Sequence, residues 1–215
     1  MIGNTLKSRY YIIKKLGNGS FGETYLAEDR DLPGYPNCVV KRLKPTSNHP
    51  FVLATAERMF NTEAETLYKL NHPQIPKLQA YFSEKGEFYL VQDVIDGEDL
   101  SKTELVLGKK LGEKEAINLL AEVLEGLAYV HQQNIIHRDM KPANLMRRRT
   151  DGKVCLIDFG TVKLNFVGNQ VTVMAGTKGY MPNEQANGTP KLSTDIYAVG
   201  VMAIQALTGF SANPS

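Results

Sequence analysis

The sequence has few cysteines and almost no excess of positive over negative charge. Both facts narrow the classes of protein to which it can belong. Only Cys38 and Cys155 occur among its 215 residues, each inside an apolar, strand-like run. Two isolated thiols of this kind favour a reducing compartment over a disulfide-stapled secreted fold, so we expect a cytoplasmic protein. The 25 basic and 23 acidic side chains give a net charge of +2. This near balance argues against nucleic acid as the main partner.

Long hydrophobic runs are also missing. The longest apolar stretch, 196–207, has 12 residues, which is too short to span a bilayer and is typical of a buried helix. The start of the chain, 1–17, contains no apolar signal-peptide core. The sequence contains no internal repeat and no low-complexity tract. We therefore expect a globular protein of one or two domains without a membrane segment.

A glycine-rich stretch, LGNGSFGETYLAED at 16–29, carries Gly17, Gly19 and Gly22 at the spacing G-x-G-x-x-G. Glycines at this spacing let backbone amides approach a phosphate, because a side chain would block the approach. Two kinds of site share the pattern. A dinucleotide-binding turn has a strand before it and a helix after it, whereas a kinase-type lid lies between two strands. No amphipathic helix follows Gly22, and Thr24 and Tyr25 are poor helix formers, which favours the lid.

The expected secondary structure divides the chain into a β-rich part and an α-rich part. Apolar and β-branched runs predict strands at 10–16, 24–29 and 38–44, and a hairpin at 78–94 with its turn at Lys85-Gly86. Helical spacing predicts helices at 52–70, 113–134 and 193–207, the last capped by Ser193 or Thr194. The linker-like run VIDG lies between the two parts. We therefore predict an α+β fold with one lobe at 1–93, a hinge at 94–97 and a second lobe at 98–215.

The lid interpretation predicts a lysine on the next strand and a carboxylate on the following helix. Lys41 ends the run CVVK, and Glu63 falls on the apolar stripe of the helix expected at 52–70. A charge on a buried face needs a partner, whereas Glu65 points elsewhere and should be solvated. We therefore predict a Lys41–Glu63 ion pair, in which Lys41 orients the α- and β-phosphates of a nucleotide.

Two further stretches, IIHRDMKPANLM at 135–146 and CLIDFG at 155–160, decide between the interpretations. With the glycine loop, Lys41, Glu63, GTKGYMPNE (176–184) and STDIYAVG (193–200), they occur in the order and at the spacing of protein kinases. From about Tyr10 to Thr208 the sequence resembles the eukaryotic-like serine/threonine kinases of bacteria. One such motif could arise by chance, but an ordered set of this size makes coincidence negligible.

The resemblance implies a bilobal kinase fold that transfers the γ-phosphate of ATP, with Mg²⁺ or Mn²⁺, to serine or threonine hydroxyls of protein substrates. Asp139 would orient the substrate hydroxyl, and Lys141 would touch the γ-phosphate. Asn144 and Asp158 would hold the metal ion. The implied nucleotide contacts are Leu16, Gly17, Gly19, Ser20, Phe21, Gly22, Thr24, Val39, Lys41, Asp93, Asp99 and Met146, with Gln92 at the gatekeeper position.

The resemblance also assigns the activation segment, 158–184. Thr177 fits the threonine that serine/threonine kinases aim at the catalytic aspartate, and Thr161 lies too near the D-F-G motif to be a phosphorylation site. We therefore predict that Thr172 is the main autophosphorylation site and that its phosphate pairs with Arg138.

The family further implies a stack of side chains that joins the lobes and is anchored on Asp195. Its members would be Leu67, Leu78, His137 and Phe159. Outside the motifs, the arginine run at 147–149 is expected to be the solvated rim of a hairpin.

Several positions depart from the family pattern. Val39 replaces the usual alanine above the adenine, and Thr24 replaces the usual valine, so both reshape the adenine roof. Two other functions stay open beside the protein kinase: a catalytically weak kinase-like module that binds nucleotide or partners, and a small-molecule phosphotransferase.

The family normally continues beyond LTGFSANPS with three more helices, one of which supplies an arginine partner for the equivalent of Glu184. We therefore expect the helix at 193–207 to expose Val201, Ile204 and Leu207. A chain with such a patch should self-associate and have low activity.

Overall fold

The computed structural model describes residues 1–19, 22–43, 50–159, 163–167, 170–174, 176–210 and 212. Side chains are described for these ranges except at 19, 50–53, 55, 56, 59, 163–167 and 170–174. The chain divides into two compact units. The first comprises Met1–Lys69 and Pro76–Val94, and the second comprises Leu70–Ile75 and Ile95–Ser215.

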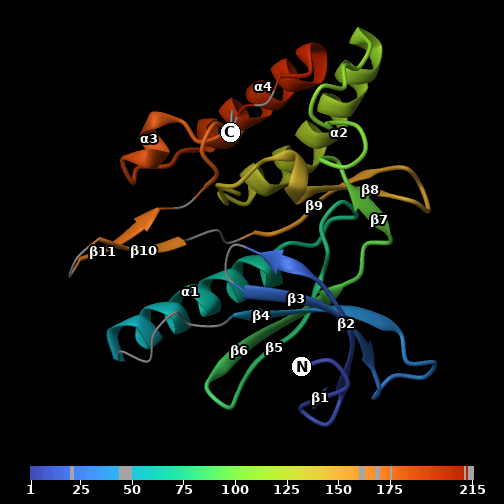
Figure 1. Cartoon of the computed structure of the whole chain (residues 1–215), viewed down its shortest axis with the longest axis vertical. Coiled ribbons are helices and arrows are strands. Elements are labelled where there is room, and N and C mark those ends of the chain that lie inside the picture. The colour runs from blue at the N-terminus through green and yellow to red at the C-terminus, as the bar shows by residue number, and fades with distance from the viewer. Residues whose placement is uncertain are drawn as a thin grey trace. The chain divides into compact units, whose positions relative to one another are not determined.

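The first unit is an antiparallel sheet with one long helix, α1 (Pro50–Lys69). Its strands are β1 (Thr5–Leu6), β2 (Tyr10–Gly19), β3 (Gly22–Asp29), β4 (Asn37–Leu43), β5 (Leu78–Glu84) and β6 (Glu87–Asp93), in the order β1-β2-β3-β4-β6-β5 (Figure 1). The expected hairpin is confirmed, with Lys85 and Gly86 at its turn. Their φ angles of 52° and 77° are those of a type I′ turn, whose twist matches that of the flanking strands.

The two faces of this sheet have different roles. One face forms an apolar core of Leu6, Tyr10, Ile12, Tyr25, Ala27, Cys38, Val40, Tyr89 and Val91. The opposite face is covered by α1, because Phe60 of the helix lies 5.1 Å (ring centroids) from Phe88, which pairs across strands with Leu43. Side chains alternate along a strand, so Lys41 lies on the same face as Leu43 and therefore faces the helix side.

The second unit contains two long helices that lie side by side, α2 (Glu113–Gln132) and α4 (Leu192–Thr208). A three-stranded sheet of β7 (Gly97–Asp99), β8 (Leu145–Arg148) and β9 (Val154–Leu156) packs against α2. The unit also contains a short 3-10 helix, η1 (Pro142–Asn144), the hairpin β10 (Lys163–Val167) and β11 (Gln170–Met174), and the short helix α3 (Asn183–Ala186). The expected cap at Ser193 or Thr194 was wrong, because Lys191 occupies the N-cap position of α4, and its N–H donates to the Thr194 hydroxyl at 3.0 Å.

A short segment of the expected first lobe belongs to the second unit. Gln74 is 1% exposed, and its amide donates to the Glu122 carbonyl (2.8 Å) and the Val154 carbonyl (2.9 Å). Its own carbonyl accepts the Leu156 N–H at 2.8 Å. Residues 70–75 therefore join α2 to β9, and the first unit is not the contiguous segment 1–93.

The prediction of a solvated arginine run was wrong for Arg148, whose side chain is 20% exposed, and for Arg147. The Arg147 side chain is 25% exposed and pairs with Glu104 (2.8 Å) and with Glu122 of α2 (2.7 Å). Burial alone would lower the pKa of Arg147, but the two carboxylates outweigh this effect and raise it. Arg147 therefore fixes the β8–β9 hairpin to α2, which the arginine run in the sequence did not indicate.

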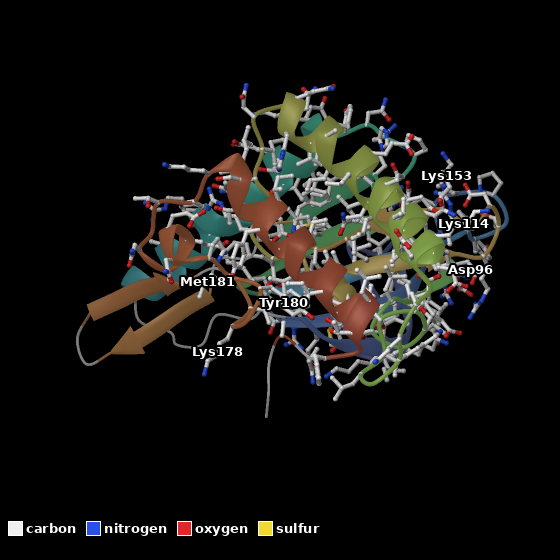
Figure 2. The ribbon with its side chains drawn as sticks, turned by 90° about the horizontal axis from the view of Figure 1, so that it is seen from above. Asp96, Lys114, Lys153, Lys178, Tyr180 and Met181 are labelled. Carbon is white, nitrogen blue, oxygen red and sulfur yellow. The ribbon has the colours of Figure 1, made fainter. Side chains whose placement is uncertain are left out.

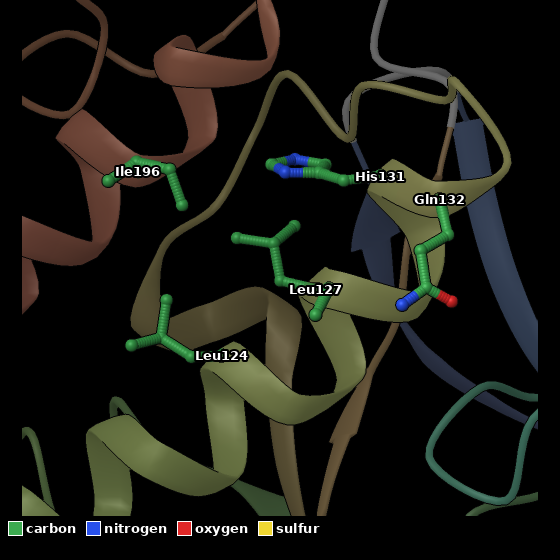
Figure 3. Close-up of a pocket in the computed structure, with 6 residues that line it drawn as sticks. Leu124, Leu127, His131, Gln132 and Ile196 are labelled. Atoms are coloured by element: carbon green, nitrogen blue, oxygen red, sulfur yellow. The ribbon is translucent and has the colours of Figure 1, made fainter.

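Apolar side chains remain exposed along both long helices of the second unit. In α4, Ile204 is 61% exposed and Leu207 is 48% exposed, as expected, whereas Val201 is half-buried. Leu124 of α2 and Ile196 of α4 line an apolar groove with Leu127, Ala128, His131 and Gln132 (Figure 3). None of the helices in the described ranges is long and apolar enough to cross a bilayer.

Candidate active site

A buried carboxylate in the first turn of α4 accepts hydrogen bonds from the HRD stretch (137–139). Asp195 is 1% exposed, and its two oxygens accept the backbone N–H groups of His137 (2.8 Å) and Arg138 (2.9 Å). The His131 Nε2 lies 2.9 Å from the same carboxylate. These bonds support the unusual backbone of Arg138, whose φ is 67°. The turn that they hold is followed immediately by Asp139.

Three polar side chains converge on Asp139, which is 3% exposed. The Thr177 hydroxyl donates to its Oδ1 at 2.6 Å, and the Lys141 ammonium lies 2.8 Å from its Oδ2. The same ammonium donates to the Thr177 hydroxyl at 2.9 Å. The Asn144 amide donates to the Asp139 Oδ2 (2.9 Å) and to its backbone carbonyl (2.8 Å). Thr177 thus lies next to Asp139, as expected from the sequence.

The hydrogen bonds of the Asn144 side chain use its NH₂ group, so its amide oxygen could bind a cation. Its NH₂ group donates twice to Asp139, so its Oδ1 is the remaining polar atom of the side chain. The Ile157 N–H donates to the Asn144 carbonyl at 2.9 Å, which brings the residue before Asp158 to Asn144. An amide oxygen and a carboxylate suit Mg²⁺, which completes its shell with water and phosphate oxygens. Within the described residues, His, Cys, Asp and Glu form no metal-binding group of three or more.

The HRD stretch is tied to the D-F-G stretch through His137. Its Nε2 lies 2.9 Å from the Ile157 carbonyl, and its ring centroid lies 4.6 Å from that of Phe159. His137 and Phe159 were two members of the expected stack. The other two, Leu67 and Leu78, lie in the first unit, so a stack of all four stays a prediction.

The glycine-rich stretch forms a hairpin with strands on both sides, which is the arrangement of a lid rather than a dinucleotide-binding turn. Gly17 pairs with Thr24 and Gly19 pairs with Gly22. A Cβ at Gly22 would lie 1.8 Å from the Arg42 carbonyl oxygen, so β4 itself requires a glycine here. Gly17 has open space around it. Leu16 is half exposed, and the predicted contacts Ser20 and Phe21 lie outside the described residues.

Lys41 and Glu63 lie on facing elements of the first unit. Lys41 pairs across strands with Thr24 on one side and with Leu90 on the other. Glu63 is half-buried in α1, about one turn after Phe60, whereas Glu65 is exposed. The helix therefore presents Glu63 toward the face that carries Lys41, and their ion pair stays a prediction.

The remaining predicted nucleotide contacts differ in their burial and in the hydrogen bonds that their side chains already make. Val39, half-buried, pairs across strands with Gln92, which is 3% exposed. The Asp93 carboxylate accepts the Lys77 N–H (3.2 Å) and the Gln79 amide (2.8 Å), so it is turned toward β5.

Asp99 lies in the second unit, as the cross-strand neighbour of Met146. Burial raises the pKa of Asp99, but hydrogen bonds from Lys102 and Ser101 outweigh it and hold the pKa below its usual value. Asp99 is therefore an ionised acceptor.

The predicted phosphorylation site lies on a hairpin of the second unit. Thr172 belongs to β11 and pairs across strands with Asn165 of β10, but its side chain lies outside the described residues. Thr161 also lies outside them. The role of Thr172 stays a prediction.

Two buried glutamines support the segment around Thr177, and the sequence motifs indicated neither. Gln185 is 6% exposed and donates to the Arg138 carbonyl at 2.6 Å. Gly176 has a φ of 118°, and a Cβ there would lie 2.5 Å from the Gln185 amide nitrogen. Gln205 of α4 is also 6% exposed. A polar residue inside the apolar run VMAIQAL was the signal that could have identified Gln205.

Comparison with known proteins agrees with this geometry. The model of the protein kinase domain matches residues 10–214. The chain belongs to the protein kinase family. Serine/threonine-protein kinase C of Synechocystis is 45% identical over 213 residues, which are 95% of this chain and 40% of that protein. Serine/threonine-protein kinase PknA of Nostoc is 44% identical, over 95% of this chain and 38% of its own length.

A solved structure shows the same kinase fold. The kinase domain of Mycobacterium tuberculosis PknI, solved as a double mutant, superposes with a TM-score of 0.75 and 25% identity, covering 98% of this chain and 76% of that one. The kinase domain described above spans about two-fifths of the length of the curated relatives that it matches. The predicted family and the predicted α+β kinase fold are confirmed.

Proposed function

We propose that this kinase domain transfers the γ-phosphate of ATP to serine or threonine hydroxyls of protein substrates. The observation that carries the proposal is the cluster at Asp139. Its carboxylate already accepts a hydrogen bond from one threonine hydroxyl, that of Thr177, at 2.6 Å. The same kind of contact would orient the hydroxyl of a substrate. Relatives named as serine/threonine kinases support the choice of acceptor.

In the proposed reaction, the substrate oxygen forms a bond to the γ-phosphorus while the bond from that phosphorus to the bridging oxygen breaks. ADP leaves, and the proton of the substrate hydroxyl passes to Asp139. The Lys141 ammonium would stabilise the charge on the transferred phosphoryl group, because it is held beside Asp139 and Thr177. Transfer is thus a matter of positioning and charge neutralisation.

The other predicted residues have supporting roles in this proposal. Asn144 and Asp158 would hold Mg²⁺, which when bound neutralises charge on the phosphates. Lys41, held by Glu63, would orient the α- and β-phosphates, and the backbone of the β2–β3 hairpin would cover them. In the second unit, Asp99 would accept a hydrogen bond from the ribose, since its carboxylate stays ionised.

A phosphate-transfer assay tests the proposal. Purified protein is incubated with radiolabelled ATP, Mg²⁺ and a generic protein substrate, and nucleotide binding is titrated in parallel. Asp139→Asn should keep ATP affinity and lower kcat by at least ~10²-fold, the scale for a positioned acid–base group. The matched control is Asp96→Asn, which changes an exposed aspartate of the same unit.

Three results would contradict the proposal in different ways. Nucleotide binding without any transfer would favour a binding module. Transfer to small molecules but not to protein would favour the phosphotransferase alternative. An Asp139→Asn variant that turns over at the wild-type rate would remove the role of Asp139.

A further inference from the structure

Charged side chains on the sheet face opposite α1 meet at the base of the glycine-rich hairpin. Glu23 follows Gly22 directly on β3. Its carboxylate accepts hydrogen bonds from the Lys15 ammonium of β2 (2.5 Å), the Tyr25 hydroxyl of β3 (2.8 Å) and the Arg42 guanidinium of β4 (2.9 Å). The bond from Lys15 is the largest cause that lowers the pKa of Glu23, to about 2, so the carboxylate is ionised at neutral pH. One carboxylate therefore joins three strands at the hairpin.

Arg42 extends the same network to a fourth strand. Its guanidinium donates from Nε to the Glu87 Oε2 at 2.7 Å and from a second nitrogen to the other oxygen of that carboxylate. The Tyr89 hydroxyl also donates to the Glu87 Oε2, at 2.7 Å. The Arg42 side chain is 15% exposed, so its contacts are partly buried and bidentate, unlike solvated surface pairs, which contribute little to stability. Arg42 is thus fixed between Glu23 on β3 and Glu87 on β6.

The network lies behind the predicted phosphate-binding face rather than on it. Arg42 follows Lys41 on β4, and successive side chains of a strand point to opposite faces, so the two residues lie on opposite faces of the sheet. The strands approach closely here, since a Cβ at Gly22 would lie 1.8 Å from the Arg42 carbonyl oxygen. Arg42 therefore connects the second strand of the hairpin to the strand of Lys41 from the side away from the nucleotide.

We propose that Glu23 and Arg42 are positioning residues for the nucleotide. Their ion pair holds the base of the glycine-rich hairpin against β4 and so sets where the hairpin backbone meets the phosphates. The proposal rests on the proposed function, because it needs the hairpin to cover ATP. Neither side chain touches the nucleotide. Without the pair, a smaller fraction of molecules holds the hairpin where its amides reach the phosphates, and the apparent affinity falls by that fraction.

Nucleotide titrations test the proposal with Glu23→Gln and Arg42→Met. Both variants keep a side chain of similar length, so the apolar core of the sheet stays packed. We expect the Kd for MgATP to rise about fivefold, as when one molecule in about five holds the hairpin in place. The Kd for adenosine, which has no phosphates, should stay within about twofold. The double variant should bind MgATP no more weakly than the worse single variant, because both changes break the same contact.

Two controls change charges away from the hairpin. Glu28→Gln alters the opposite end of β3, where the Glu28 Oε2 lies 3.5 Å from the Arg30 guanidinium. Lys114→Gln removes one positive charge, as Arg42→Met does, but at the exposed start of α2 in the second unit (Figure 2). Both should keep the wild-type Kd for MgATP. Equal weakening of MgATP and adenosine binding in Glu23→Gln or Arg42→Met would show that the pair only stabilises the sheet and would overturn the proposal.

Hydrogen exchange and transfer assays separate this proposal from the proposed function. The amides of Asn18 and Thr24, on the two strands of the hairpin, should exchange at least about fivefold faster in Glu23→Gln and Arg42→Met than in the two controls. This readout requires neither ATP nor activity. Faster exchange with weaker MgATP binding, in a protein that transfers no phosphate, would support the role of the pair and refute the proposed function. Unchanged exchange, or an unchanged Kd for MgATP, would refute that role whether or not the protein transfers phosphate.

Discussion

The contact of Asp195 with the HRD stretch gives the sharpest prediction on stability. In Asp195→Asn the side chain keeps its shape but replaces one oxygen by an NH₂ group. One oxygen can still accept a backbone N–H, whereas the NH₂ group faces the other N–H as a second donor. Hydrogen bonds to an ionised group contribute about 1.5–3 kcal/mol each, and a buried donor without an acceptor costs about 1–3 kcal/mol. We therefore expect a loss of about 2–5 kcal/mol in the free energy of unfolding.

This loss is large against the stability of a typical domain, about 5–15 kcal/mol. It should appear as a lower midpoint in urea unfolding followed by circular dichroism, with an unchanged slope. The amides of His137 and Arg138 should also exchange faster, because they lose their acceptor. Asp96→Asn, an exposed change in the same unit, should leave the midpoint in place. If Asp195→Asn unfolds at the same urea concentration as the wild type, Asp195 does not hold the loop.

Three further predictions concern activity and association. Lys41→Met and Glu63→Gln should each lower kcat/KM, and the double variant should lose no more than the worse single variant; additive losses would argue against the pair. After incubation with MgATP, phosphopeptide mapping should find phosphate on Thr172, and Arg138→Ala should remove its effect on activity; phosphate only at other sites would refute this. Ile204→Lys should lower light scattering by this chain, because it places a charge in an exposed apolar stripe; unchanged scattering would show that the stripe does not mediate association.

The sequence predicted the local features of this fold well. The turn at Lys85-Gly86 follows from two residues that tolerate positive φ, and the strands on both sides of the glycine loop follow from β-branched runs without helical spacing. The order of the kinase motifs predicted Asp139, Asn144 and the D-F-G stretch as one site. The structure places Thr177 and Asn144 against Asp139.

The contacts that the sequence did not predict join residues far apart in the chain. Gln74 reaches Val154 across 80 positions, and Gln205 reaches Leu105 across 100. A glutamine follows no periodicity, and its partners here are backbone carbonyls, which every residue has. A glutamine inside an apolar run can be recognised as buried, but no pattern of residue types indicates which backbone carbonyl its amide meets, and only the packed chain shows that.

Arg147 shows that the sequence also does not indicate the long-range partners of charged residues. In the sequence it is the first of three arginines, and such a run is usually solvated. In the structure its guanidinium lies between Glu104 and Glu122, which come from different segments. Motif order thus determined the family and the fold class, whereas the roles of the site residues stay predictions. Tertiary structure alone decided which polar side chains hold those residues in place, because a hydrogen bond depends on distance and direction in space and not on separation along the chain.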